Sequence, residues 1–112
     1  MSPPRHEVTV GEIRIAADRP LVLIAGPCAI EGRDHALMMA AAVSEICAGV
    51  GIPLIYKSSF DKANRTSAGT ARGVGLERGL EILAEVKATT GLPVLTDVHE
   101  SWQCGPVAEV VD

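Results

Sequence analysis

The sequence is poor in aromatic residues, with one Trp, one Tyr and one Phe in 112 residues, and it has no long apolar run. The apolar stretch at residues 21–26 is far too short to span a bilayer. The first seven residues lack the apolar core of a secretory signal. The net charge of -4 excludes the broad positive field of nucleic-acid-binding proteins. We therefore expect a cytoplasmic protein without a membrane or nucleic-acid partner.

Paired cysteines are also absent. Cys28, Cys47 and Cys104 make an odd count without a paired spacing, so a disulfide framework is not expected and a reducing compartment is favoured. Free cysteines usually pack as small apolar side chains, which is the expectation for Cys47 and Cys104. Spacing alone would also predict that Cys28 packs as a small apolar side chain. Cys28 differs from the other two because it lies at the end of the predicted strand at residues 21–26.

The residues present, rich in Ala, Val, Leu and Ile, predict alternating strands and helices. Residues 8–15 form a strand–turn–strand pattern, and continuous apolar sequence over residues 21–26 favours a strand buried on both faces. Further strands are predicted over residues 53–60 and 93–100, with a fourth approached at residues 109–112.

Two long helices separate these strands. We expect the first to begin near Asp34 as N-cap and to stop at Gly49 or Gly51, and the second to run from Gly75 to Gly91. A short helix capped by Ser101 is expected to extend through residue 107. Inward packing on the first helix is predicted for Leu37, Met38, Ala41, Val43 and Ile46.

This alternation predicts right-handed βαβ units around a parallel sheet. The sheet belongs either to a doubly wound fold or to a (β/α)₈ barrel, of which this chain would hold three units and the start of a fourth, because a complete barrel takes about 250 residues. The predicted division is an N-terminal tail and hairpin at residues 1–17 and the α/β part at residues 18–112. The run from Gly73 to Gly79 lacks the spacing of a dinucleotide-binding fingerprint.

Reactive or charged side chains follow each of the three strands. Cys28 follows the first, Lys57 and Ser59 the second, and Asp97 and His99 the third. Ligands of parallel α/β folds bind at the carboxyl ends of the strands. Residues 57–67 add cations and hydroxyl groups suited to phosphates and carboxylates. A lysine at the end of a buried strand needs a charge partner, either a bound anion or Asp97. Without these coincidences the stretch would be a charged surface loop.

Three motifs carry a resemblance to a known family: IAGPCAIE at residues 24–31, KSSFDKANRTS at residues 57–67 and TDVHESW at residues 96–102. Together they resemble the 3-deoxy-D-manno-octulosonate 8-phosphate synthases. The related 3-deoxy-D-arabino-heptulosonate 7-phosphate synthases share the GPC motif but carry KPRTS where this chain has KANRTS, and they are the alternative. The family's usual pattern is lost over residues 68–71.

The resemblance implies the first part of a homotetrameric (β/α)₈ barrel. Such an enzyme condenses phosphoenolpyruvate with D-arabinose 5-phosphate and water for lipopolysaccharide biosynthesis. It also implies that Lys57, Ser59 and Lys62 contact phosphoenolpyruvate, and that Lys62 is catalytic together with Asp97 and His99. The residues implied for the sugar phosphate are Asn64, Arg65 and Thr66.

The resemblance also implies a subclass. The family has a metal-dependent branch with Cys at the position of Cys28 and a metal-free branch with Asn there. The resemblance implies a divalent Zn, Fe or Mn ion on the Cys28 thiolate, with the remaining His, Glu and Asp ligands outside this chain. The sequence stops in mid-pattern, which predicts an N-terminal portion that is inactive alone. A truncated, non-catalytic chain that binds anions is the alternative from another class.

Overall fold

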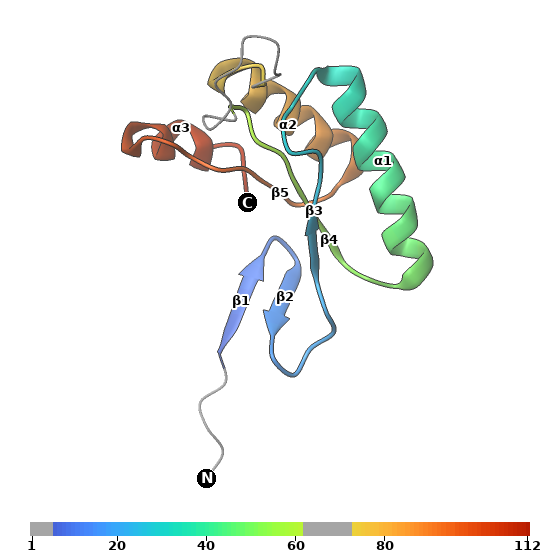
Figure 1. Cartoon of the computed structure of the whole chain (residues 1–112). Helices are drawn as coiled ribbons and strands as arrows, with labels where there is room; N and C mark the ends of the chain where they lie inside the picture. Colours follow the sequence, from blue (N-terminus) through green and yellow to red (C-terminus); the bar gives the residue numbers. More distant parts are fainter. Residues whose placement is uncertain (1–5, 62–72) are drawn as a thin grey trace.

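The computed structural model describes residues 6–61 and 73–112, and Figure 1 shows their arrangement. A two-stranded sheet comes first in the chain, followed by strands that alternate with helices. The elements in chain order are β1 (Glu7–Val10), β2 (Ile13–Ala16), β3 (Leu23–Ala25), α1 (Arg33–Val50), β4 (Leu54–Lys57), α2 (Leu76–Thr90), β5 (Val94–Leu95), the 3₁₀ turn η1 (Ser101–Gln103) and α3 (Cys104–Ala108).

Strands β1 and β2 pair antiparallel, with Val10 opposite Ile13 across a turn at Gly11. Gly11 has a φ of 57°, a left-handed conformation that favours glycine at a tight turn. A side chain at Gly11 would lie 3.3 Å from the Pro93 ring, so the turn contacts the segment that enters β5. The two-stranded sheet therefore sits at the end of the molecule where the parallel strands begin (Figure 1).

The second sheet is parallel, with the order β3-β4-β5. Both connections between its strands are helices, α1 and then α2, which pack against each other and against β4 and β5. The mixed α/β class and the predicted alternation are therefore present. No helix in residues 6–61 or 73–112 combines the length and apolarity needed to cross a membrane.

Strand β4 is the centre of this sheet and of the core. Leu54, Ile55 and Tyr56 are buried, and Tyr56 and Phe60 pack with apolar residues of both helices. The cluster comprises Ile30, Ala36, Ala40, Tyr56, Phe60, Ile82, Leu83, Val86, Val94 and Val107. Because β4 has a strand on each side and helices against one face, its burial follows directly from its central place.

Strand β3 is less buried than its sequence predicts. Leu23 and Ile24 are exposed, and Leu21 before them is 75% exposed. Strand β3 lies at the edge of its sheet and pairs only with β4. Burial on both faces needs packing layers on both, so the prediction was wrong for the described chain.

Helix boundaries agree with the glycine stops but not with the predicted caps. Gly51 and Gly91 end α1 and α2 in the left-handed conformation, with φ of 72° and 74°. The N-cap of α1 is Gly32, and Asp34 lies in the first turn instead. Glu100, not Ser101, is the N-cap of η1.

The inward face of α1 also differs from the prediction. Ala36, Ala40 and Cys47 are its buried residues, while Met38 and Ile46 are 57% and 67% exposed. Ala41 is exposed as well and Val43 is only partly buried, whereas Leu37 packs against the core as predicted. Small residues on the buried face allow the helix to lie close to its neighbours, so the packing favours Ala36 and Ala40 over the longer side chains.

Candidate functional site

The predicted site lies where the three parallel strands end. Beyond β3 and β4 the pairing continues, because Ser59 N donates to Cys28 O at 3.1 Å and Ile30 N donates to Ser59 O at 2.9 Å. On the other side, Ser58 N donates to Leu95 O at 3.4 Å. The structure thus brings the segments that carry Cys28, Lys57 and Asp97 to one edge of the sheet.

Close backbone approach at Gly26 makes this edge compact. A Cβ atom at Gly26 would lie 1.9 Å from Lys57 O and 2.9 Å from Lys57 C. Only glycine allows the end of β3 to come this near to β4. The glycine that precedes Pro27 and Cys28 is therefore a steric requirement of the site.

Phe60 anchors the chain on both sides of the undescribed segment. Its side chain is 1% exposed, and Gly75 N donates to Phe60 O at 2.9 Å. A Cβ atom at Gly73 or Gly79 would lie 2.4 Å from Phe60 atoms. The predicted ligand-binding residues Lys62, Asn64, Arg65 and Thr66 lie outside the described residues.

Ser59 is fully buried at this edge. Its hydroxyl donates to Asp61 O at 2.9 Å and accepts from Asp61 N at 3.2 Å. The hydroxyl therefore holds the turn that leaves β4, and its predicted contact with a substrate stays a prediction.

Lys57 and Asp97 are both partly buried, yet no ion pair joins them. Within the described ranges, no partner is found for the ammonium group of Lys57, and Asp97 Oδ1 is buried without a hydrogen-bond partner. Buried polar atoms are normally satisfied, so Asp97 Oδ1 marks a place for a ligand or for residues outside the described ranges, and the unpaired Lys57 ammonium is available to an anion. The sequence offered two charge partners for Lys57, a bound anion and Asp97, and Asp97 forms no ion pair with it in the described structure.

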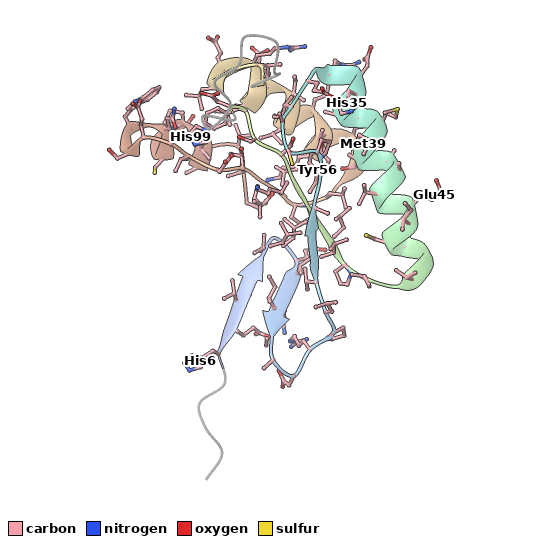
Figure 2. The ribbon with its side chains drawn as sticks, in the orientation of Figure 1. His6, His35, Met39, Glu45, Tyr56 and His99 are labelled. Atoms are coloured by element: carbon pink, nitrogen blue, oxygen red, sulfur yellow. The ribbon has the colours of Figure 1, made fainter. Side chains whose placement is uncertain are left out.

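His99 faces the turn after β4. Its ring lies 5.4 Å from the Phe60 ring, and its Nε2 contacts the carbonyl oxygen of Asp61. Figure 2 places His99 on the segment that leads to α3, at the end of the molecule opposite to His6. The ring position is thus set by the same turn that Ser59 holds.

Sequence reasoning missed Gln103, which is 9% exposed behind His99. Its Oε1 accepts from His99 N at 2.8 Å and from Glu100 N at 3.1 Å. A glutamine three residues after the N-cap is the available sign, because it can reach back to the start of the turn.

Cys28 is exposed at the end of the segment that follows β3. Cys47 is buried as predicted, whereas Cys104 is exposed, so its predicted burial was wrong. In the part of the chain that the structure covers, no group of three or more His, Cys, Asp or Glu side chains could hold a metal ion. Cys28 can supply a single thiolate, which is a strong ligand for divalent transition metals.

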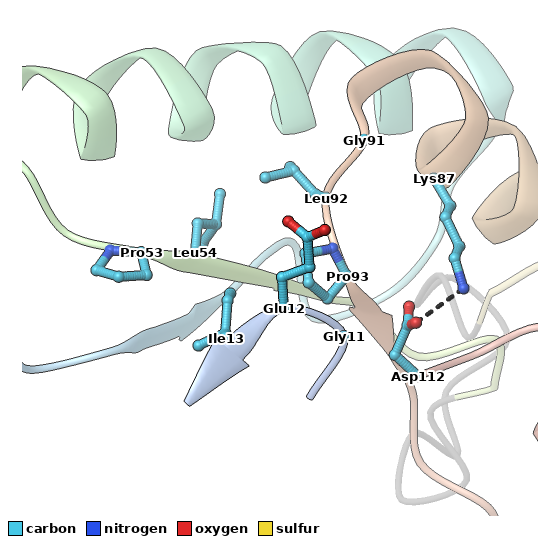
Figure 3. A pocket seen from close by; sticks show the side chains of 10 residues that line it. All are labelled: Gly11, Glu12, Ile13, Pro53, Leu54, Lys87, Gly91, Leu92, Pro93 and Asp112. Atoms are coloured by element: carbon cyan, nitrogen blue, oxygen red, sulfur yellow. Dashed lines mark hydrogen bonds and ion pairs between the residues drawn. The ribbon is translucent and has the colours of Figure 1, made fainter. Parts of the chain in front are cut away.

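A cavity of about 410 Å³ lies at the opposite, amino-terminal edge of the sheet (Figure 3), a volume within the usual range of small-molecule pockets. The Lys87 ammonium donates to Asp112 Oδ1 across 2.8 Å in its wall, and Asp112 Oδ2 accepts from Val94 N at 3.0 Å. Burial raises the pKa of the Asp112 carboxyl, but hydrogen bonds from Lys87 and Val94 and the Lys87 charge outweigh it and lower the pKa overall. This cavity is not where the predicted site residues gather.

Parallel strands connected by helices define the chain as an α/β protein. More narrowly, residues 5–112 match the DAHP synthetase I family, and the chain belongs to that family.

The chain is 59% identical over 105 residues to a 2-dehydro-3-deoxyphosphooctonate aldolase of Granulibacter bethesdensis. Proteins of the same name from Methylobacterium radiotolerans and Bradyrhizobium diazoefficiens are 58% and 56% identical over 105 residues. Each alignment covers 94% of this chain and 37% of the relative. The chain therefore spans little more than a third of the length of these relatives.

Proposed function

We propose that this chain is part of an enzyme that condenses phosphoenolpyruvate with D-arabinose 5-phosphate. A carbon–carbon bond forms between C3 of the enolpyruvate and the sugar aldehyde, water adds at C2, and inorganic phosphate leaves. The product, 3-deoxy-D-manno-octulosonate 8-phosphate, serves lipopolysaccharide biosynthesis. The name of the relatives describes this same eight-carbon product, which supports the proposal.

One observation of the site carries the proposal furthest. Lys57 lies at the end of the central strand, and its ammonium group has no partner among the described residues. An ammonium group at a strand exit, without a counter-charge among its described neighbours, is available to bind an anion. The two substrates together bring two phosphates and a carboxylate, whose mutual repulsion must be offset by cations. Lys62, Asn64, Arg65 and Thr66 are proposed to complete this binding.

Asp97 and His99 are proposed to act on the reacting atoms, together with Lys62. Asp97 Oδ1 is buried and free to accept a proton or a hydrogen bond from a bound molecule. His99 is held by Asp61 and Gln103 and can pass a proton to or from water. Ser59 supports this arrangement by fixing the turn whose Asp61 carbonyl contacts His99.

We further propose that Cys28 is one ligand of a divalent metal ion of the Zn, Fe or Mn type. Its thiol is exposed at the strand edge, and the other ligands must come from outside the described residues. Such an ion would polarise the sugar aldehyde or activate water. The proposal extends to a (β/α)₈ barrel, which the parallel β3-β4-β5 sheet supports, and to a homotetramer in the cytoplasm.

The test is phosphate release by the protein expressed from its whole reading frame. Phosphoenolpyruvate is supplied with either D-arabinose 5-phosphate or D-erythrose 4-phosphate. Preference for the five-carbon sugar is expected. Preference for erythrose 4-phosphate would instead establish the heptulosonate alternative. The matching family, DAHP synthetase I, is named after that alternative. Activity with neither sugar would favour a non-catalytic anion-binding chain.

A charge-removing variant tests the role of Lys57. Lys57→Met keeps the aliphatic stem, and loss of a charge-assisted contact of about 1.5–3 kcal/mol should raise KM for phosphoenolpyruvate about tenfold to a hundredfold. Lys87→Met is the matched control, because Lys87 lies at the other edge of the sheet. Equal effects of the two substitutions would contradict the assignment of Lys57.

A further inference from the structure

Two hydroxyl groups connect the three strand ends through a central residue. Ser58 Oγ donates to Pro27 O at 2.6 Å, and Thr96 Oγ1 donates to Ser58 O at 2.8 Å. Ser58 is 1% exposed, so its bond to Pro27 is shielded from water. The path Thr96–Ser58–Pro27 therefore runs across the whole edge of the sheet, from the exit of β5 to the exit of β3.

Each member of this path is bonded covalently to a candidate site residue. Pro27 precedes Cys28, Thr96 precedes Asp97, and Ser58 lies between Lys57 and Ser59. The three hydrogen-bonded residues thus lie beside the candidate groups without being those groups. A shift of any one of them moves a neighbouring functional side chain.

We propose that Ser58 and Thr96 are positioning residues that set the separation of the Cys28 thiol and the Asp97 carboxylate across Lys57. The alternative is that both hydroxyls only satisfy carbonyl groups and contribute stability. The two are distinguishable because stability is lost in either case, whereas the geometry of the edge changes only if the path positions it. The kinetic part of the test rests on the proposed condensation, and the chemical part does not.

The chemical part measures the alkylation rate of Cys28 by iodoacetamide in chelator-treated protein from the whole reading frame. A Cys104→Ser background removes the other exposed thiol of the described residues, since Cys47 is buried, and alkylation is quantified on the peptide that contains Cys28. Ser58→Ala and Thr96→Val should each change the rate by about threefold or more, because thiol reactivity follows its local environment. Thr96→Ser keeps the hydroxyl and should restore the original rate.

Thr90→Val is the matched control. The Thr90 hydroxyl is also partly buried, donates to Val86 O at 2.7 Å and accepts from Leu92 N at 3.2 Å, but it lies at the carboxyl end of α2. Its loss removes comparable hydrogen bonds away from the strand exits. It should lower the unfolding midpoint without changing the Cys28 rate.

In the kinetic part, Thr96→Val should lower kcat about tenfold to a hundredfold, since small misplacements of reacting groups have effects of that size. KM for phosphoenolpyruvate should stay within about threefold. Unchanged alkylation rates in both variants, or the same change in Thr90→Val, would overturn the positioning role. If the unsubstituted protein releases no phosphate, the condensation is refuted and the alkylation rates alone decide the positioning role.

Discussion

Replacement of Gly26 by alanine is expected to open the edge of the sheet at which the site residues gather. The added Cβ would lie 1.9 Å from Lys57 O, a backbone atom that cannot rotate away. Real Cβ contacts below 3.0 Å are essentially never seen. The ends of β3 and β4 would therefore have to separate by roughly 1 Å, and closely packed interiors resist such a shift.

The magnitude follows from what this separation breaks. Forcing a methyl group into a packed site costs about 1–3 kcal/mol. The bonds from Ser59 N to Cys28 O and from Ser58 Oγ to Pro27 O, at 3.1 and 2.6 Å, lie beside Gly26 and would be stretched or lost. Each contributes about 0.5–1.5 kcal/mol. We expect a total loss of about 3 kcal/mol in the free energy of unfolding.

Gly49→Ala is the control for this prediction. Gly49 is in α1, and nothing lies within 4 Å of its added Cβ. The substitution should stabilise the protein by about 0.5–1 kcal/mol, because alanine is the better helix former. Urea unfolding followed by circular dichroism, on protein from the whole reading frame, measures both. A Gly26→Ala protein within about 0.5 kcal/mol of the unsubstituted one, a change typical of surface sites, would refute the close approach of the two strands.

The remaining predictions concern the core, the opposite edge and the thiol. Tyr56→Phe should change stability by no more than about 1 kcal/mol, because the buried Tyr56 hydroxyl interacts with the Ser58 side chain without completing a hydrogen bond; a larger loss would show that this hydrogen bond is fully formed. Because the pKa of Asp112 is lowered, its contribution to stability is full above its ordinary pKa of about 4 and is lost as the pH falls through the lower folded value. The difference in unfolding midpoint between the protein and its Lys87→Gln variant should therefore narrow toward acid, and a constant difference would contradict this linkage. Cys28→Asn should lower the content of tightly bound divalent metal measured by elemental analysis, and an unchanged content would exclude Cys28 as a ligand.

Much of the fold was predictable because local rules dominate there. Gly51 and Gly91 stop their helices since glycine adopts the left-handed conformation most easily. The burial of β4 was predicted from its apolar residues Leu54 to Tyr56, and its central place in the sheet provides that burial. The exposure of β3 was not predictable, because it depends on which strands and helices lie beside it and not on its own residues.

The candidate site was predictable only in part. The alternation of strands and helices was enough to place Cys28, Lys57 and Asp97 at one edge of the sheet, since parallel strands share the direction of their ends. Gln103 was missed although its place three residues after the N-cap was a sign, whereas Ser58 and Thr96 were missed because a hydrogen bond from a side chain to a distant backbone group leaves no periodic trace in the sequence. Such bonds are visible only once the segments that they join lie next to each other.

At this edge, the hydrogen-bonded polar groups hold the strand ends in position, and the unpaired polar groups are available to a ligand. Ser58 and Thr96 have their hydroxyls bonded to strand-end carbonyls, so they hold positions and have little left to offer a ligand. The Lys57 ammonium and Asp97 Oδ1 have no partner within residues 6–61 and 73–112. Because buried polar groups are costly when unpaired, a folded protein keeps them where something else binds. At this edge, Asp97 Oδ1 and the Lys57 ammonium are therefore the groups left for substrate, metal or the rest of the protein, and both belong to the sequence motifs.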